Sequence, residues 1–167
     1  MKTKINKKVM TDILTGLPNR RSLLEKVNIN ETNRRMTSAD TALIVVLLDS
    51  FRIVKNNYNH RDVILVEVSK RLKEHLRSTD MVARWSSNEF IILLPKTNAS
   101  HAFAVAENLR KEISNVAIDA DNYQYDITAT FGVSDYQDDD TFEETLINTG
   151  AAMIPKANVD NNRVVMA

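Results

Sequence analysis

The chain of 167 residues contains no cysteine, which excludes disulfide bonds and metal sites built from thiolates. It has only three glycines, and this shortage matters because glycine often lets a backbone approach a phosphate group closely. Neither sign of charge is in excess, since 22 basic residues balance 22 acidic ones, so no overall charge draws the chain to nucleic acid or an anionic membrane. No apolar run reaches the roughly 20 residues that a membrane-spanning helix needs.

What the chain does contain is typical of one globular domain. Its length suits a single domain, and 43% hydrophobic residues beside 26% charged ones are enough for a core. The first residues, MKTKINKKVM, are basic but lack the apolar stretch of a signal peptide. We expect residues 1–11 to form a lead-in helix and residues 12–167 to form the domain.

The hydrophobic pattern predicts five strands. Residues 41–48 (TALIVVLL) form a continuous apolar run, which indicates a strand buried on both faces at the centre of a sheet. Residues 81–85 and 90–94 are β-prone runs on either side of a polar turn, which is typical of a hairpin. A strand within residues 123–136 and an edge strand at residues 163–166 complete the prediction.

Helices are expected between these strands. Amphipathic spacing predicts four longer helices, and one or two helical turns near residues 51–57. The four helices are residues 20–35, 61–76, 99–116 and 141–154. Residues 56–60 and 119–122 are expected to be loops. This order predicts an α/β fold with one mixed central β-sheet covered by helices, and no second domain.

The polar residues form no familiar catalytic pattern by type and spacing. His60, His75 and His101 lie far apart without metal-ligand spacing, so we expect them to be structural or exposed. Ser86 and Ser87 have no base placed by a motif, which argues against a nucleophile.

Several segments together resemble the GGDEF family, the diguanylate cyclase domains. Residues 12–21 (DILTGLPNRR) match the family's DxLTGLxNRR motif at every fixed position, and a match of this length is highly specific. Residues 80–90 (DMVARWSSNEF) resemble its DxxxRxGGDEF segment, and residues 127–134 (ITATFGVS) resemble its TxSxG strand. The resemblance extends from residue 12 to residue 163. It implies a nucleotide-cyclase palm with a ferredoxin-like core, and a role in bacterial cyclic di-GMP signalling.

In active members of that family two domains meet head to head, each with one GTP, and join the nucleotides into cyclic di-GMP. Two metal ions assist this reaction, and Mg²⁺ prefers carboxylate ligands. The family supplies them from the first Asp of a DxDxFK motif and the third position of GGDEF, where this chain has Leu47 and Asn88. Ser86 and Ser87 replace the two glycines, so a position that needs positive φ would cost on the order of 1 kcal/mol.

Other positions of the implied site differ as well. Lys55 stands where the family has a guanine-reading Asn, and Asp62 matches the guanine-reading Asp, as a vestigial contact, only if two residues are deleted after His60. Asn158 and Asn161 replace the Lys and Gly of the closing AKxxGRNR motif. The remnants of the catalytic site are Asp49, Ser86, Ser87, Asn88 and Glu89. We expect these residues to hold no metal and to condense no GTP, so that no cofactor is required.

One ligand motif of the family is retained. Residues 77–80 fit RxxD at the family's spacing before the turn, and RxxD marks the inhibitory site that binds cyclic di-GMP. An arginine forks onto guanine or phosphate, and an aspartate accepts from guanine N–H groups. The resemblance therefore implies a cyclic di-GMP site at Arg77 and Asp80, with Arg110 as a further contact. Without the resemblance, an Arg near a helix end beside an Asp is typical of a surface ion pair.

Three functions remain open from the sequence. The domain is a receptor for cyclic di-GMP, or it is an interaction module that binds no nucleotide and pairs with another GGDEF domain, as in a homodimer, or with an effector domain. The third alternative is a weakly active cyclase that uses Asp49, Asp62 and Glu89 with GTP and Mg²⁺. We expect no contact of the domain itself with nucleic acid or membrane, and a cytoplasmic location within a larger signalling protein.

Overall fold

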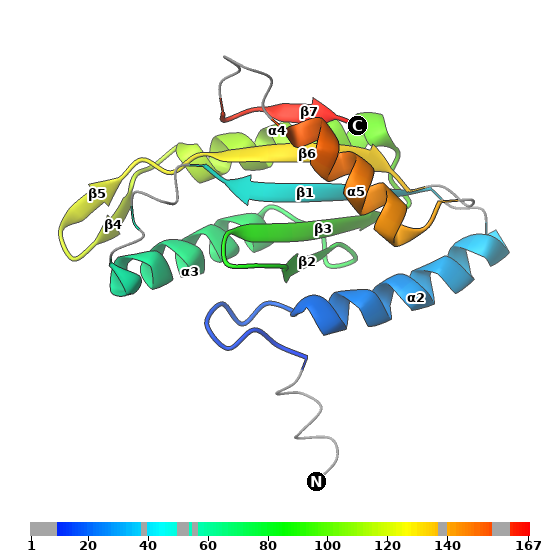
Figure 1. Ribbon diagram of the computed structural model, residues 1–167, viewed down its shortest axis with the longest axis horizontal. Helices are drawn as coiled ribbons and strands as arrows, with labels where there is room; N and C mark the ends of the chain where they lie inside the picture. Colours follow the sequence, from blue (N-terminus) through cyan, green and yellow to red (C-terminus); the bar gives the residue numbers. More distant parts are fainter. Residues whose placement is uncertain (1–9, 38–39, 50–53, 55–56, 137–139, 155–160) are drawn as a thin grey trace, which may run out of the picture.

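A five-stranded sheet in the order β2-β3-β1-β6-β7 organises the chain (Figure 1). The computed structural model describes residues 10–37, 40–49, 54, 57–136, 140–154 and 161–167. The central strand β1 (Thr41–Leu48) pairs antiparallel with β3 (Glu89–Pro95) and with β6 (Ala129–Asp135). At the edges, β2 (Met81–Arg84) pairs antiparallel with β3, and β7 (Val164–Met166) pairs parallel with β6. The sheet is therefore mixed, and the predicted central strand, hairpin and edge strand are confirmed.

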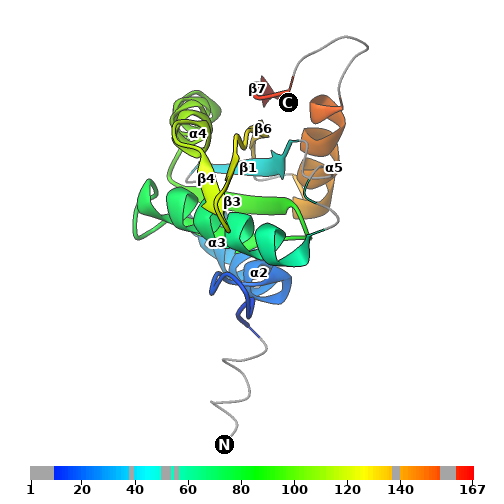
Figure 2. The same cartoon turned by 90° about the vertical axis from the view of Figure 1, so that its left-hand side faces the viewer.

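Helices cover both faces of this sheet (Figure 2). The helices α3 (Tyr58–Glu74) and α4 (Ala99–Ser114) pack on one face. The helices α2 (Arg20–Thr37) and α5 (Phe142–Met153) pack on the other. This arrangement confirms the predicted α/β fold, and none of the helices in the described ranges is long and apolar enough to cross a membrane.

The two-sided cover explains why β1 is apolar at every position after Thr41. Ala42, Ile44 and Val46 join the core beneath α3 and α4, whereas Leu43 joins the core with Leu23 of α2. Successive side chains of a strand point to opposite faces, so a central strand between two helical layers requires apolar residues throughout.

Close packing of α5 depends on the glycine of β6. A methyl group at Gly132 would lie 2.6 Å from Sδ of Met153 and 2.8 Å from Cγ2 of Thr149, both on α5. These distances are shorter than van der Waals contact, so a side chain at this position would push the helix away from the sheet.

Asparagine side chains cap the starts of α2 and α3. The Oδ1 atom of Asn19 accepts a hydrogen bond from the amide of Ser22, which ends the N-terminal turn (residues 12–19) and begins α2. The Oδ1 atom of Asn57 accepts from the amide of His60 in the same way. The loop predicted at residues 56–60 is therefore wrong at its end, because α3 begins at Tyr58.

A second predicted loop, at residues 119–122, is a small hairpin. The strands β4 (Ile118–Ala120) and β5 (Tyr123–Tyr125) pair antiparallel. Asp121 and Asn122 join them with φ of 50° and 67°, the left-handed backbone that a tight two-residue turn favours. The strand predicted within residues 123–136 is therefore β6, which begins at Ala129.

Two further predictions fall largely outside the described residues. Only residues 10 and 11 of the expected lead-in helix, and residues 54 and 57 of the expected turns at 51–57, are described.

Candidate functional site

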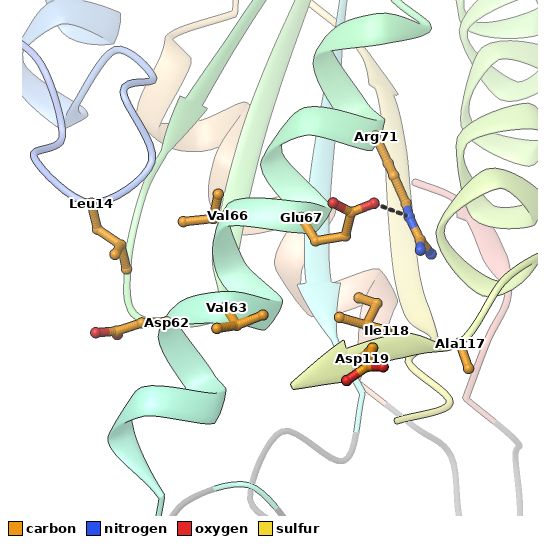
Figure 3. Close-up of a pocket in the computed structure, with 9 residues that line it drawn as sticks. All are labelled: Leu14, Asp62, Val63, Val66, Glu67, Arg71, Ala117, Ile118 and Asp119. Carbon is orange, nitrogen blue, oxygen red and sulfur yellow. Dashed lines mark hydrogen bonds and ion pairs between the residues drawn. The ribbon is translucent and has the colours of Figure 1, made fainter. Parts of the chain in front are cut away.

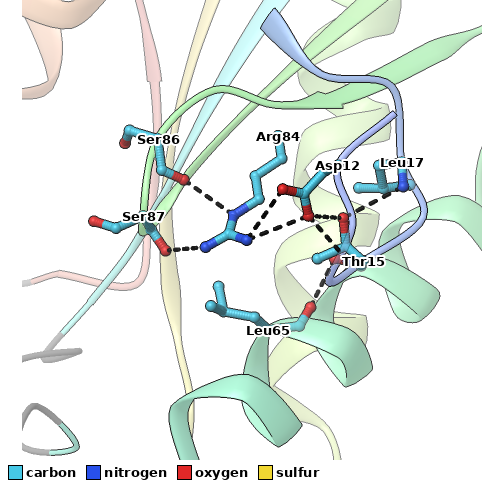
Figure 4. A network of polar contacts seen from close by, with 8 residues as sticks. Asp12, Thr15, Leu17, Leu65, Arg84, Ser86 and Ser87 are labelled. Carbon is cyan, nitrogen blue, oxygen red and sulfur yellow. Dashed lines mark hydrogen bonds and ion pairs between the residues drawn. The ribbon is translucent and has the colours of Figure 1, made fainter. Parts of the chain in front are cut away.

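The hairpin turn (residues 85–88) between β2 and β3 is anchored by Arg84 (Figure 4). The Nε atom of Arg84 donates to the carbonyl of Ser86 at 3.3 Å, and an Nη atom donates to the carbonyl of Ser87 at 3.5 Å. The same guanidinium forms an ion pair with Asp12 at 3.2 Å. The hairpin turn is therefore tied to the N-terminal turn, which lies more than sixty residues earlier in the chain.

The Asp12 carboxylate is the centre of that link. It accepts hydrogen bonds from the amide of Thr15 at 2.9 Å and from its hydroxyl at 2.7 Å. Burial raises the pKa of Asp12, but the hydrogen bonds from Thr15 and the charge of Arg84 outweigh burial and hold the pKa below its ordinary value of 3.8. Asp12 and Thr15 of the motif thus hold the hairpin turn in place through Arg84.

The two serines form the hairpin turn without left-handed backbone. Within the described ranges, the non-glycine residues with positive φ are Lys96, Asp121, Asn122 and Asn162. Ser86 and Ser87 are therefore free of the strain that would follow if the hairpin turn needed the φ of glycine. The hydroxyl of Ser86 is buried without a hydrogen-bond partner among the described atoms.

Asp49, at the end of β1, is committed to structural hydrogen bonds. Its Oδ2 atom accepts from the hydroxyl of Thr128 at 2.7 Å and from the amide of Asn162 at 2.9 Å, while Oδ1 accepts from the hydroxyl of Thr130 at 2.7 Å. The residue is 7% exposed. Its charge therefore fastens β1 to β6 and to the segment before β7.

The residues around Asp49 do not fit the two-metal centre that the family resemblance implies. The amide of Leu48 donates to the carbonyl of Asn88 at 3.0 Å, so the end of β1 and the hairpin turn are adjacent. Leu47 and Asn88 nevertheless offer no carboxylate there, and Leu47 pairs with Glu89 across the two strands. Mg²⁺ needs several hard oxygen ligands. The carboxylate of Asp49 already accepts three hydrogen bonds, and Glu89 lies opposite Leu47, so these two carboxylates are a poor ligand set for two metal ions.

Arg77 and Asp80, by contrast, are brought together. Asp80 Oδ1 accepts from an Nη atom of Arg77 at 2.9 Å, and Oδ2 accepts from the Arg77 amide at 2.8 Å. A further Nη contact reaches the hydroxyl of Thr97 at 2.8 Å. The hydrogen bond to Asp80 raises the pKa of Arg77. The side chain of Asp80 is 3% exposed and that of Arg77 is 57% exposed, so a buried carboxylate positions an exposed guanidinium.

This pair borders a cleft of about 440 Å³ between the end of α3 and the start of β2. We name it the Arg77 cleft. Leu17, Leu76 and Met81 give it apolar walls, and Lys73 and Arg77 give it two positive charges against the buried carboxylate of Asp80. Its size and mixture of apolar and cationic groups suit an anionic ligand with flat rings.

Two other predicted contacts lie elsewhere. Arg110 donates to Glu107 at 2.9 Å and to Oδ1 of Asn162 at 3.1 Å, and among the described residues it contacts neither Arg77 nor Asp80. The hydrogen bond from Arg110 lowers the pKa of Glu107. Asp62 lines a separate cleft on the outer face of α3. The structure therefore joins only Arg77 and Asp80 of the predicted ligand set, and the roles of Arg110 and Asp62 stay predictions.

Sequence reasoning missed the partners of the anchoring residues. Thr128 and Thr130 alternate along the chain, a spacing that places both hydroxyls on one face of a strand, and that pattern was available from the sequence. No local signal pointed to Asn162, which lies 113 residues from the carboxylate that it contacts.

Comparisons with known proteins agree with this fold and motif set. The sequence profile described as "Diguanylate cyclase, GGDEF domain" matches residues 9–163. Diguanylate cyclase DgcP of Pseudomonas aeruginosa is 27% identical over 96% of the chain, and Diguanylate cyclase A of Treponema denticola is 31% identical over 75%. The chain spans 24% and 35% of the lengths of these two proteins.

Solved structures with the same fold include two of particular interest. Diguanylate cyclase SiaD of Pseudomonas aeruginosa, in complex with its activator SiaC, superposes with a TM-score of 0.89 at 28% identity, over 99% of this chain and 65% of that one. The coiled coil and GGDEF domain of DgcB from Caulobacter crescentus, in complex with c-di-GMP, gives 0.90 at 20% identity, over 99% and 90%. With the profile match over nearly the whole sequence, these findings show that the chain belongs to the GGDEF family of diguanylate cyclase-like domains of cyclic di-GMP signalling.

Proposed function

We propose that this domain is a receptor for cyclic di-GMP that binds the dinucleotide in the Arg77 cleft and does not condense GTP. The observation that carries the proposal is the contrast between two aspartates. Asp80 is hydrogen-bonded to the guanidinium of Arg77, an exposed side chain beside a cleft. Asp49, in contrast, is buried, and its carboxylate accepts three hydrogen bonds from the protein.

The chemistry of the Arg77 cleft matches the ligand. Cyclic di-GMP carries two phosphodiester charges and two guanines, and a guanidinium forks onto guanine O6 and N7 or onto phosphate oxygens. Arg77 makes the direct contact, and Lys73 supplies a second charge for phosphate. Asp80 is too buried to read guanine, so its role is to position Arg77 through the hydrogen bonds between them.

Loss of catalysis follows from the missing carboxylates. GTP condensation needs metal ions at the phosphates, and Leu47 and Asn88 stand where the family places their ligands. A fold of the same shape has been captured with c-di-GMP, in DgcB, which supports the view that the scaffold accommodates this ligand.

Calorimetry with three proteins tests ligand binding. We expect cyclic di-GMP to bind the wild type with a Kd on the order of ten micromolar or tighter, and Arg77→Ala to weaken binding at least about tenfold. Lys70→Ala is the matched control, because Lys70 lies on α3, pairs with Glu74 and lies outside the Arg77 cleft. Binding unchanged in Arg77→Ala would contradict the assigned site. No wild-type heat would favour the module that binds no nucleotide.

Incubation with GTP and Mg²⁺ or Mn²⁺ separately tests the proposal that the domain does not condense GTP. We expect no cyclic di-GMP in the chromatogram. Clear product would make the domain a weak cyclase, whether or not the Arg77 cleft binds ligand.

A further inference from the structure

A second cleft, on the outer face of α3, has a different character (Figure 3). Its volume is about 530 Å³. Leu14 of the N-terminal turn, Val63 and Val66 of α3, and Ile118 of β4 line it, so its walls are mainly apolar. It shares no lining residue with the Arg77 cleft. We name it the α3 cleft.

The apolar side chains of the α3 cleft are open to solvent. Val63 and Val66 are each 43% exposed and lie three residues apart, on one side of α3. Ile13 and Val116, the chain neighbours of two lining residues, are 97% and 63% exposed. Exposed apolar side chains that gather at a cleft are typical of an interaction site.

The rim of the α3 cleft is negatively charged. Asp62, Glu67 and Asp119 contribute three carboxylates, and Arg71 is the opposing charge among the lining residues. Arg71 pairs with Glu67 at 3.0 Å and donates to the carbonyls of Ile113 and Val116 at 2.7 Å each, so its charge is directed into the protein.

Asp62 and Asp119 remain as the open charges. Among the residues that the structure describes, the donors to Asp119 are neutral, namely the amide of Asn122 and the side chain of Gln124, and neither compensates its charge. Asp62 has no polar partner within the described part of the chain. A rim of this sign repels phosphates and attracts lysine and arginine.

We propose that the α3 cleft docks a basic amphipathic helix of a protein partner. Apolar residues of the partner helix, spaced three or four apart, fill the cleft against Val63, Val66 and Leu14, as in other helix-in-groove interactions. Its lysines or arginines lie over Asp62 and Asp119. The proposal does not depend on cyclic di-GMP binding, because the two clefts are separate.

A synthetic helix tests this directly. The probe is a fluorescein-labelled peptide of about 14 residues with leucine on one helical face and lysine on the other, and its counterpart has glutamate for lysine. Fluorescence anisotropy with the purified chain measures both. We expect the lysine peptide to bind in a salt-sensitive manner and the glutamate peptide to bind at least about tenfold more weakly.

Three variants locate the site. Val66→Asp should weaken the lysine peptide about tenfold by placing a charge in the apolar floor. Asp62→Lys, at an exposed position, should weaken it about threefold or more and strengthen the glutamate peptide. Ile147→Asp is the control: Ile147 is 68% exposed on α5, across the sheet from α3, and its change should alter binding less than about twofold.

Three results would overturn the proposal. The first is equal affinity of the two peptides for the wild type. The second is an effect of Ile147→Asp on peptide affinity as large as that of Val66→Asp. The third is loss of GTP or cyclic di-GMP binding in Val66→Asp while its affinity for the peptide is unchanged. The last result would assign the α3 cleft to a nucleotide. Circular dichroism melts of each variant confirm that it is folded before the titrations are compared.

Discussion

Replacing Asp49 should lower the free energy of unfolding of the domain and should not alter any dependence of its stability on metal ions. Asp49→Ala removes the acceptor of two hydroxyls and one amide at a site that is 7% exposed. Each donor left unsatisfied costs about 1–3 kcal/mol, and the threonine hydroxyls can rotate toward other acceptors, so we expect a loss of about 3–5 kcal/mol in the free energy of unfolding. Domains are stable by about 5–15 kcal/mol, so this loss is large.

Asp49→Asn should cost less. An amide oxygen in place of Oδ2 keeps the bonds from Thr128 and Asn162, and the hydroxyl of Thr130 can turn to accept from the amide nitrogen. We expect a loss of about 1–2 kcal/mol. Thr130→Val removes one donor while leaving the carboxylate with two, and should cost about 1 kcal/mol.

Urea unfolding followed by circular dichroism measures these differences. With a slope of about 2 kcal/mol per molar, Asp49→Ala should shift the midpoint downward by about 1.5–2.5 M. A variant within about 0.5 kcal/mol of the wild type would refute the anchoring role. Stabilisation of the wild type, but not of Asp49→Ala, by millimolar Mg²⁺ would also refute it, because the carboxylate would then be holding a metal.

Two further outcomes follow from the packing and the ion pairs. Gly132→Ala should lower the free energy of unfolding by about 1–3 kcal/mol in the same urea assay, because the added methyl group meets Met153 and Thr149; unchanged stability would mean that α5 is not seated on β6 as described. Asp12→Asn should lower the melting temperature at neutral pH. The pKa of Asp12 in the folded protein lies below 3.8, so its carboxylate stabilises the fold above that pH, and this stabilisation is lost as the pH falls through the folded pKa. The melting temperatures of the wild type and the variant should therefore become equal in acid. A difference in melting temperature that persists in acid would contradict the ion pair with Arg84.

Much of the fold was predictable because it rests on local pattern. Residues 41–48 could be placed at the centre of the sheet, because a run of seven apolar residues after Thr41 is typical of a strand covered on both faces. The β4–β5 hairpin could not be placed in the same way. Its strands have three residues each, too few for alternation to be read, and its turn uses Asp121 and Asn122 in place of a glycine.

In the candidate site, too, contacts between residues close in sequence were predictable and contacts between distant residues were not. Arg77 and Asp80 are three residues apart, so a motif predicted their pairing. Whether the carboxylate of Asp80 faces a ligand or its own arginine depends on burial, which only the structure provides. The network around Asp49 joins residues 79 to 113 positions apart, so no local pattern could predict that the carboxylate is already committed.

We propose that the domain binds cyclic di-GMP through Arg77 although it lacks the carboxylates for making it. Calorimetric titration of wild type and Arg77→Ala, side by side, is the most direct test. We expect saturable heat for the wild type at ligand concentrations on the order of tens of micromolar, and its loss or strong reduction in Arg77→Ala. Absence of heat from the wild type, or equal heat from both proteins, would contradict it.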